Sequence, residues 1–291
     1  MIRLIFTILI FTNYTQAQVF SDYDYVGIKS SAMAGSVSTN TNDIAGFYQN
    51  PASLAGVNDN TLLFGQSNLY QKSEFPFQYI GVNYELPFLG ETALTYQSFS
   101  TENSGVKLSS ESTISFSKAK FLQKDRNSIL ALGYRLNYYI WEQSSSAGTN
   151  GDGSNGYGSV EEQGIGVDFG IIAGLRKKYW LGGFIKNINS PAINGQNLPR
   201  SISLSIGFNP SHKTKTSISM KRLLGRQDRQ IKLGIEYDVT SLLKVMSGVQ
   251  SNPNRLGIGV EYKILDRYVF GYSILTHHIM GLSHNFEVKI K

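Results

Sequence analysis

The chain has 291 residues and a formal net charge of +6; 41% of its residues are hydrophobic, 12% aromatic and only 16% charged. The charged share is below the roughly 25% of an average soluble domain, while the aromatic content is too high for a disordered protein. Cysteine is absent, which excludes a disulfide scaffold, and the apolar runs of about 20 residues that a helical membrane protein needs are absent too. What remains is a glycine- and aromatic-rich all-β protein, either a soluble sandwich or barrel or an outer-membrane barrel.

Residues 1–17 have the layout of a signal peptide. Arg3 supplies a positive charge, residues 4–11 (LIFTILIF) form a short apolar core, and residues 15–17 (TQA) offer a small-x-small cleavage site. The alternatives are a short buried strand or an uncleaved anchor, but the apolar stretch is about half as long as a membrane span. The pattern therefore predicts export from the cytoplasm.

Residues 18–60 lack regular alternation and are rich in small and apolar side chains. Asp43 could cap a short helix over 44–48 that ends at the Asn-Pro pair of 50–51, and residues 52–56 (ASLAG) form a further turn that closes with glycine. A segment of this size and character can fill a barrel lumen. We therefore interpret it as an N-terminal hatch, followed by a barrel domain over 61–291.

From residue 61 onward, apolar and polar residues alternate with a period of two, interrupted by short stretches rich in Gly, Pro and Asp. This is the pattern of β-strands. In the segment QIKLGIEYDV, for example, Leu233 and Ile235 share one face while Lys232 and Glu236 lie on the other. Strands are predicted over 61–71, 76–86, 90–99, 110–121, 127–142, 164–175, 178–187, 200–209, 213–222, 230–239, 242–250, 255–264, 267–275 and 281–290.

The lengths of the strands and loops favour a membrane barrel over a soluble one. Most segments have about 9–11 residues, as a tilted membrane-crossing strand needs, whereas soluble strands average about 5–6. If the chain begins in the periplasm, every turn after an even-numbered strand is periplasmic and short. Those turns are short, and the long connections 143–163, 188–199 and 223–229 all follow odd-numbered strands. The expected fold is a transmembrane antiparallel β-barrel of fourteen strands in the bacterial outer membrane, with a partly helical hatch in its lumen.

The bilayer determines which face of each strand points outward. A lysine or arginine on the lipid face costs about 2–4 kcal/mol at the midplane, so charged strand residues should face the lumen or lie in the interfaces. The residues concerned are Lys232, Glu236, Glu261, Lys263, Glu287 and Lys289. Aromatic residues near strand ends should form the interfacial girdles. These are Tyr84, Tyr96, Tyr134, Tyr138, Trp141, Tyr179, Trp180, Tyr237, Tyr262, Tyr268 and Tyr272.

Three stretches of the sequence resemble one family of outer-membrane barrels. Residues 31–35 (SAMAG), 42–45 (NDIA) and 48–55 (YQNPASLA) resemble the N-terminal hatch of FadL-like proteins, most of all the PorV/PorQ branch of Bacteroidetes. The segment 272–286 resembles the closing hairpin of that branch. Residues 166–171 (GVDFGI), 186–188 (KNI) and 198–199 (LP) are similar to its central strands. The family fold is a fourteen-stranded barrel with a hatch, in agreement with the strand count.

The resemblance implies one of two functions. PorV and PorQ serve the type IX secretion system, which implies a non-enzymatic component of type IX protein secretion. Its partners would be translocon or other secretion-system subunits and secreted cargo, besides outer-membrane lipid and lipopolysaccharide. Classical FadL proteins move hydrophobic molecules, so the alternative is a FadL-like channel for molecules such as fatty acids. In either case Asn50, Pro51 and Ala52 are expected to seal or gate the lumen.

Other chemistry is disfavoured, and we expect no cofactor and no metal. His277 and His278 lie near His284, but adjacent strand residues point to opposite faces and no carboxylate completes a ligand set. Residues 150–156 (NGDGSNG) lack the closing glutamate of a calcium loop and are expected to form a surface loop. A barrel hydrolase remains a third alternative, without a recognisable positioned serine. Export makes lipopolysaccharide phosphate a better anionic neighbour than nucleic acid for this basic chain.

Overall fold

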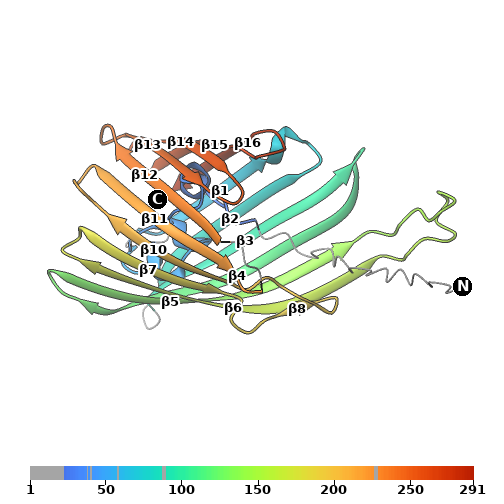
Figure 1. The fold of residues 1–291 in the computed structure, drawn as a ribbon, viewed down its shortest axis with the longest axis horizontal. Helices are drawn as coiled ribbons and strands as arrows, with labels where there is room; N and C mark the ends of the chain where they lie inside the picture. The colour runs from blue at the N-terminus through green and yellow to red at the C-terminus, as the bar shows by residue number, and fades with distance from the viewer. Residues whose placement is uncertain (1–22, 38, 40, 58, 87–89, 226–228) are drawn as a thin grey trace, which may run out of the picture.

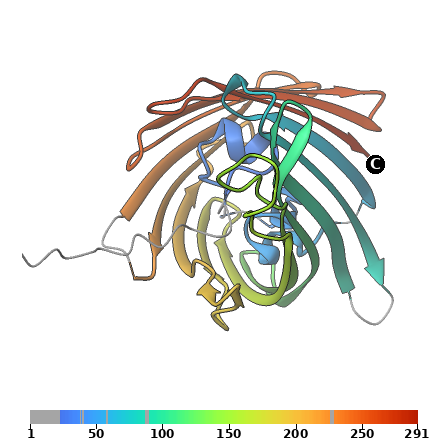
Figure 2. The ribbon, with the colours of Figure 1, turned by 90° about the vertical axis from the view of Figure 1, so that its right-hand side faces the viewer.

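The computed structural model describes residues 23–37, 39, 41–57, 59–86, 90–225 and 229–291. The signal peptide predicted over residues 1–17 lies outside this part of the chain, as do residues 18–22 of the predicted hatch. The described residues form one barrel wall with an N-terminal segment inside it (Figures 1 and 2).

The wall is a closed barrel of fourteen antiparallel strands (Figure 1). The first strand, β1, closes the cylinder by pairing with the last, β16. Closure leaves no edge of unpaired backbone groups, which a lipid environment would penalise. The barrel strands are β1 (Thr61–Asn68), β2 (Pro76–Leu86), β3 (Gly90–Asn103), β4 (Val106–Lys124), β5 (Ser128–Gln143), β6 (Val160–Leu175), β7 (Tyr179–Lys186), β10 (Ser201–Phe208), β11 (Thr214–Leu223), β12 (Arg229–Asp238), β13 (Leu243–Gln250), β14 (Arg255–Ile264), β15 (Tyr268–Leu275) and β16 (Ser283–Ile290).

The fourteen predicted strands are confirmed, and three details differ. The strand predicted over 61–71 ends at Asn68. Strands β3, β4 and β6 extend beyond their predicted ends to 14, 19 and 16 residues, because polar residues continue the pairing beyond the apolar alternation. Strand β6 accordingly begins at Val160, inside the loop predicted over 143–163. The connection after β7 also contains a separate two-stranded sheet, β8 (Ala192–Ile193) with β9 (Gln196–Asn197).

The strands alternate between lipid-facing and lumen-facing residues, as predicted. In β12, Leu233 and Ile235 are exposed on the outer wall, whereas the side chains of Lys232 and Glu236 are buried inside. The four other charged residues assigned to the lumen or interfaces form ion pairs, three of them inside the barrel and Lys263 with Asp266 at a turn. The outer wall is therefore apolar, as a transmembrane barrel requires.

Most of the tyrosines predicted to form the girdles face outward, but neither tryptophan does. Tyr84, Tyr96, Tyr134, Tyr138, Tyr179, Tyr237 and Tyr262 are exposed on the outer wall. Trp141 and Trp180 are buried instead, so their assignment to the girdles is wrong. Trp180 lies against Gly174, where a side chain would collide with the indole ring, and Trp141 packs with Tyr139 inside the barrel. At Trp180, the space that Gly174 leaves inside the barrel outweighs the preference of tryptophan for the membrane interface.

The two ends of the barrel differ in the length of their loops. The end that carries Lys291 has the short turns 125–127, 176–178, 209–213, 239–242 and 265–267. The long connections 144–159 and 187–200 lie at the other end. Short turns of outer-membrane barrels face the periplasm, so the Lys291 end is periplasmic and the opposite end extracellular.

The hatch has two halves, residues 23–37 and residues 41–57. The first contains the helix α1 (Ile28–Ala32), and the second the 3₁₀ turns η1 (Ile44–Phe47) and η2 (Pro51–Leu54). A third 3₁₀ turn, η3 (Leu69–Gln71), follows β1. No helix in the described ranges is long and apolar enough to span a membrane.

The helix predicted over 44–48 is the 3₁₀ turn η1. The Asp43 side chain pairs with Lys29, and its expected role as a cap stays a prediction. Asn50 does not merely stop this turn, because its side chain caps the following one. The glycine that closes the 52–56 turn, Gly56, has the positive φ of 79° that such a turn requires.

Candidate functional site: the hatch and its chambers

The turn at Asn50 fastens the second half of the hatch to the barrel wall. The Asn50 side chain is fully buried, and its Oδ1 accepts a hydrogen bond of 3.0 Å from the backbone N of Ala52. Its Nδ2 donates to the carbonyl oxygens of Gly183 at 3.2 Å and Ile171 at 3.4 Å. One amide thus caps η2 and binds two neighbouring strands.

Two wall glycines leave the space that this turn occupies. A Cβ atom at Gly170 would lie 1.9 Å from Asn50 Oδ1, and one at Gly133 would lie 2.4 Å from the N of Ala52 and 2.5 Å from the carbonyl C of Pro51. Protein interiors do not tolerate such overlaps without backbone shifts. The three predicted site residues therefore lie together against β5 and β6, and their gating role stays a prediction.

A buried ion pair beside this turn connects the hatch to the same strands. Arg135 Nε and Nη2 donate to Asp168 Oδ2 at 2.9 and 2.6 Å, and Arg135 Nη1 donates to the carbonyl oxygen of Phe47 at 3.0 Å. Asp168 Oδ1 accepts from the backbone N of Asn187 at 2.7 Å. Removing one partner of a buried pair typically costs about 3–5 kcal/mol, because a charge is left uncompensated.

The first half of the hatch lies on the opposite wall. Helix α1 contacts β13, β14, β15 and β16. A Cβ atom at Gly257 would lie 2.3 Å from the carbonyl oxygen of Ser31, and one at Gly271 would lie 2.7 Å from Ile28 Cγ1. Glycine in these strands thus allows the helix backbone to approach the sheet closely.

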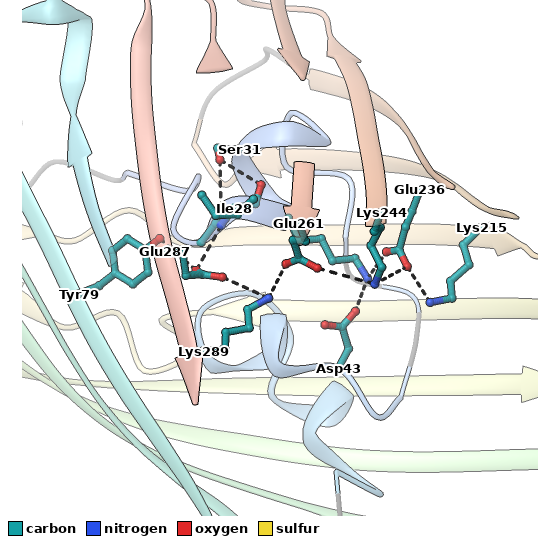
Figure 3. A network of polar contacts seen from close by, with 12 residues as sticks. Ile28, Ser31, Asp43, Tyr79, Lys215, Glu236, Lys244, Glu261, Glu287 and Lys289 are labelled. Atoms are coloured by element: carbon teal, nitrogen blue, oxygen red, sulfur yellow. Dashed lines mark hydrogen bonds and ion pairs between the residues drawn. The ribbon is translucent and has the colours of Figure 1, made fainter. Parts of the chain in front are cut away.

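A chain of alternating charges lines the wall beneath α1 (Figure 3). Lys289 Nζ lies 2.5 Å from Glu261 Oε1, and Lys244 Nζ lies 3.7 Å from Glu261 Oε2. Lys244 also pairs with Glu236 at 3.1 Å, and Lys215 with the same carboxylate at 2.7 Å. Each lumen-facing carboxylate in the chain thus has cationic partners, as buried charges require.

Hatch groups complete this network. Lys29 of α1 lies 2.9 Å from Glu236 Oε2 and also pairs with Asp43 of the second half. Glu287 Oε2 accepts the backbone N–H of Ile28 at 3.3 Å (Figure 3). Burial alone lowers the pKa of Lys29, but the carboxylates of Asp43 and Glu236 outweigh it and raise that pKa above its ordinary value. The Lys29 side chain is therefore a cation that connects both halves of the hatch to the wall.

A chamber of about 60 Å³ that is partly open to solvent lies on the extracellular side of the hatch. One side is aromatic: the rings of Tyr23 and Phe77 lie 4.9 Å apart, and Tyr48 and Phe99 also line the space. The remaining wall is mostly polar. It includes Gln97, Glu111, Thr113, Ser115, Arg135, Asn137, Lys186, Ser201, Ser203, Ser219, Lys221 and Lys232.

A second, larger chamber of about 400 Å³, also open to solvent, lies on the periplasmic side. Its lining combines lysines with carboxylates. The charged residues are Lys29, Asp43, Asp59, Lys215, Asp238, Lys244, Glu261, Lys263, Lys289 and Lys291. The hatch therefore separates an aromatic-sided extracellular chamber from a strongly charged periplasmic one.

Sequence reasoning identified some of these residues but not their association. Alternation predicted the inward direction of Glu236 and Glu261, whereas it did not predict their convergence on Lys244. Arg135 and Asp168 were also missed as a pair, although each is the only charged residue in the middle of its strand. That isolation was the available signal, because a membrane barrel admits such charges only on its inner side.

The histidines and the glycine-rich loop show no metal-binding arrangement. His277 and His278 lie in the loop between β15 and β16 with ring centroids 4.4 Å apart. Among the residues described, no group of three or more His, Asp or Glu side chains is placed to hold a metal ion. Residues 151–155 are exposed, in agreement with the predicted surface loop, and Asp152 Oδ1 accepts from the backbone N of Ser154 at 2.9 Å.

Comparison with solved structures identifies the fold. The toluene transporter TbuX of Ralstonia pickettii is similar with a TM-score of 0.64 at 12% identity, covering 93% of this chain and 99% of that one. The CymD monoaromatic hydrocarbon channel has a TM-score of 0.61 at 14% identity, covering 91% and 96%. A Pseudomonas aeruginosa FadL homologue has a TM-score of 0.51 at 11% identity, covering 90% and 97%. No protein-family model and no curated protein matches the sequence.

These likenesses extend over at least 90% of the chain. Together with the closed wall and its apolar outer face, they place the protein in the bacterial outer membrane. The chain therefore has the fold of the FadL-type hydrocarbon channels, a fourteen-stranded barrel around an N-terminal hatch.

Proposed function

We propose that this protein is a non-enzymatic outer-membrane channel of FadL type that takes up small hydrophobic molecules. The observation that carries the proposal is the aromatic side of the extracellular chamber, formed by Tyr23 and Tyr48 of the hatch together with Phe77 and Phe99 of the wall. Binding sites for small apolar molecules are concave and lined by aromatic side chains with a few polar groups. The solved structures of similar fold include channels for monoaromatic hydrocarbons.

Uptake of labelled toluene and labelled oleate tests this proposal, in bacterial cells that carry the protein in place of their own channel. Phe99 stacks on Phe75 with ring centroids 6.3 Å apart and lines the chamber. Losing one buried aromatic contact costs about 1.5–3 kcal/mol, or roughly tenfold or more in affinity. We therefore expect Phe99→Ala to lower uptake at limiting substrate about tenfold. The control Phe270→Ala, on the lipid face of β15, should retain it. Equal uptake by cells with and without the protein contradicts the proposal.

A second candidate is the PorV/PorQ-like role in type IX protein secretion that the sequence resemblance implies. The observation in its favour is the firm attachment of the hatch to both walls, through Asn50 and Arg135 on one side and Lys29 on the other. A permanently plugged barrel fits a protein that acts through partners rather than by conduction. Affinity purification from the outer membrane tests it: recovery of translocon subunits or secreted cargo supports secretion, and a lone barrel with bound lipid supports transport.

A further inference from the structure

We propose that a permeation route runs along the seam between β1 and β16. The two halves of the hatch close this route through polar contacts with each other across it. This inference rests on the proposed channel function and specifies its regulation. The tie on the periplasmic side is the ion pair of Lys29 with Asp43. The tie on the extracellular side is Gln49, whose Nε2 donates to the carbonyl oxygen of Asp24 and, at 2.8 Å, to Ser30 Oγ.

A small cavity of about 20 Å³, room for about one water molecule, lies beside this seam between the two chambers. It shares the lining residues Val26 and Tyr48 with the extracellular chamber. It shares Lys29, Asp43, Ile44 and Lys289 with the periplasmic chamber. Its outer wall comes from Leu63 of β1 and from Glu287 and Lys289 of β16. The three spaces therefore follow one another through the barrel, with the hatch on one side and the β1–β16 seam on the other.

The two halves of the hatch are attached to different parts of the wall. The α1 half contacts β13 to β16, and the η2 turn contacts β3, β4, β5 and β6. Asp43 belongs to the second half, because its backbone N donates to the carbonyl oxygen of Ser53 at 3.0 Å. Lys29 belongs to the first half, where Glu236 holds its ammonium at 2.9 Å. The pair of Lys29 and Asp43 thus bridges two bodies that have separate anchors.

Loss of this bridge has a defined consequence. Lys29 keeps Glu236 when Asp43 is neutralised, and Asp43 keeps its backbone bonds when Lys29 is neutralised. Each half therefore retains its own attachment to the wall while the ionic contact between them disappears, and only the Gln49 tie on the extracellular side still joins them. The small cavity lies at that contact, since both residues of the pair line it. Separation of the halves joins the two chambers without unfolding the barrel.

Single-channel recording in KCl with the full-length protein in planar bilayers tests the route. We expect the double variant Lys29→Met/Asp43→Asn to pass a current that the parent lacks, with Asp43→Asn alone and Gln49→Ala each giving brief openings. The matched control is Lys263→Met/Asp266→Asn, which removes an ion pair at a periplasmic turn outside the hatch and should stay closed. A closed double variant, or the same current in the control, overturns the proposal.

Thiol labelling locates the current within the barrel. The chain has no cysteine, so Leu63→Cys places a unique thiol in the small cavity. A charged methanethiosulfonate reagent should react at least about fivefold faster in the double-variant background than in the parent, the lower end of the effect of one coupling contact, and should block the current. Equal reaction rates, or an unblocked current, place the route elsewhere.

The two proposals fail separately. If the double variant passes the current but cells show no hydrocarbon uptake, the route is supported and the hydrophobic substrate is refuted. If uptake is normal but the double variant shows neither a current nor faster labelling, the substrate is supported and this route is refuted. The Gln49→Ala variant keeps the test valid where the double variant does not fold, because it leaves all charges of the lumen in place.

Discussion

Asn50 offers the sharpest test of how the hatch is held. Replacing it with alanine removes the acceptor of the 3.0 Å hydrogen bond from Ala52 N and both donor contacts to the carbonyl oxygens of β6 and β7. The carbonyl groups of Ile171 and Gly183 still lie within the paired strands, whereas the buried N–H of Ala52 loses its acceptor. An unsatisfied buried donor costs about 1–3 kcal/mol. Local opening of the second half of the hatch should therefore become about 5- to 150-fold more frequent.

Asn50→Asp should be more damaging than Asn50→Ala. Aspartate keeps the acceptor for Ala52 N, but its second oxygen points at the carbonyl oxygens of Ile171 and Gly183. That arrangement buries a charge whose second oxygen has no donor and faces two carbonyl oxygens, which costs more than the absence of the side chain. The ordering separates a bonding role of the amide from a mere space-filling role.

Hydrogen–deuterium exchange followed by mass spectrometry measures these effects. Peptides from residues 41–57 should exchange faster in both variants, and peptides from residues 23–37 should not, because the two halves have separate anchors. Asn209→Ala, which removes a hydrogen bond at a periplasmic turn, is the matched control. Unchanged exchange in 41–57, or a milder effect of aspartate than of alanine, would refute this account of the turn.

Two further changes have predictable outcomes. Gly257→Ala places a Cβ against the α1 backbone and should cost about 1–3 kcal/mol of hatch docking; Gly158→Ala, which meets open space, should cost nothing comparable, and equal exchange in the two variants contradicts the close approach. His277 Nδ1 accepts from the backbone N of Ile279 at 3.2 Å and Met280 at 3.0 Å, and burial first, then nearby cations, lower its pKa. Because the folded pKa is depressed, the loop's stability is present at neutral pH and is lost as the pH falls through that pKa. An NMR titration that puts the His277 pKa at or above its usual value of about 6.5 contradicts this.

Alternation and loop length were sufficient to predict the barrel. A period of two is a local property of the chain, and a membrane wall forces it to be regular because one face meets lipid and the other the lumen. The inward direction of Glu236 and Glu261 followed for the same reason. The failures are also local: Trp180 turned inward because Gly174 leaves room for its ring, which no periodicity reveals.

The architecture of the hatch depends on contacts between residues that are distant in sequence. That an N-terminal segment fills the lumen could be predicted from composition. That Lys29 meets Glu236, and that Asn50 meets Gly170, could not, because both contacts depend on the register of a closed fourteen-stranded wall. The sequence by itself therefore determined the low charge, the export and the two-faced strands of this protein. Only the tertiary structure decided which inward charges converge and where the lumen is closed, since barrel closure sets the distances between strands that local patterns leave free.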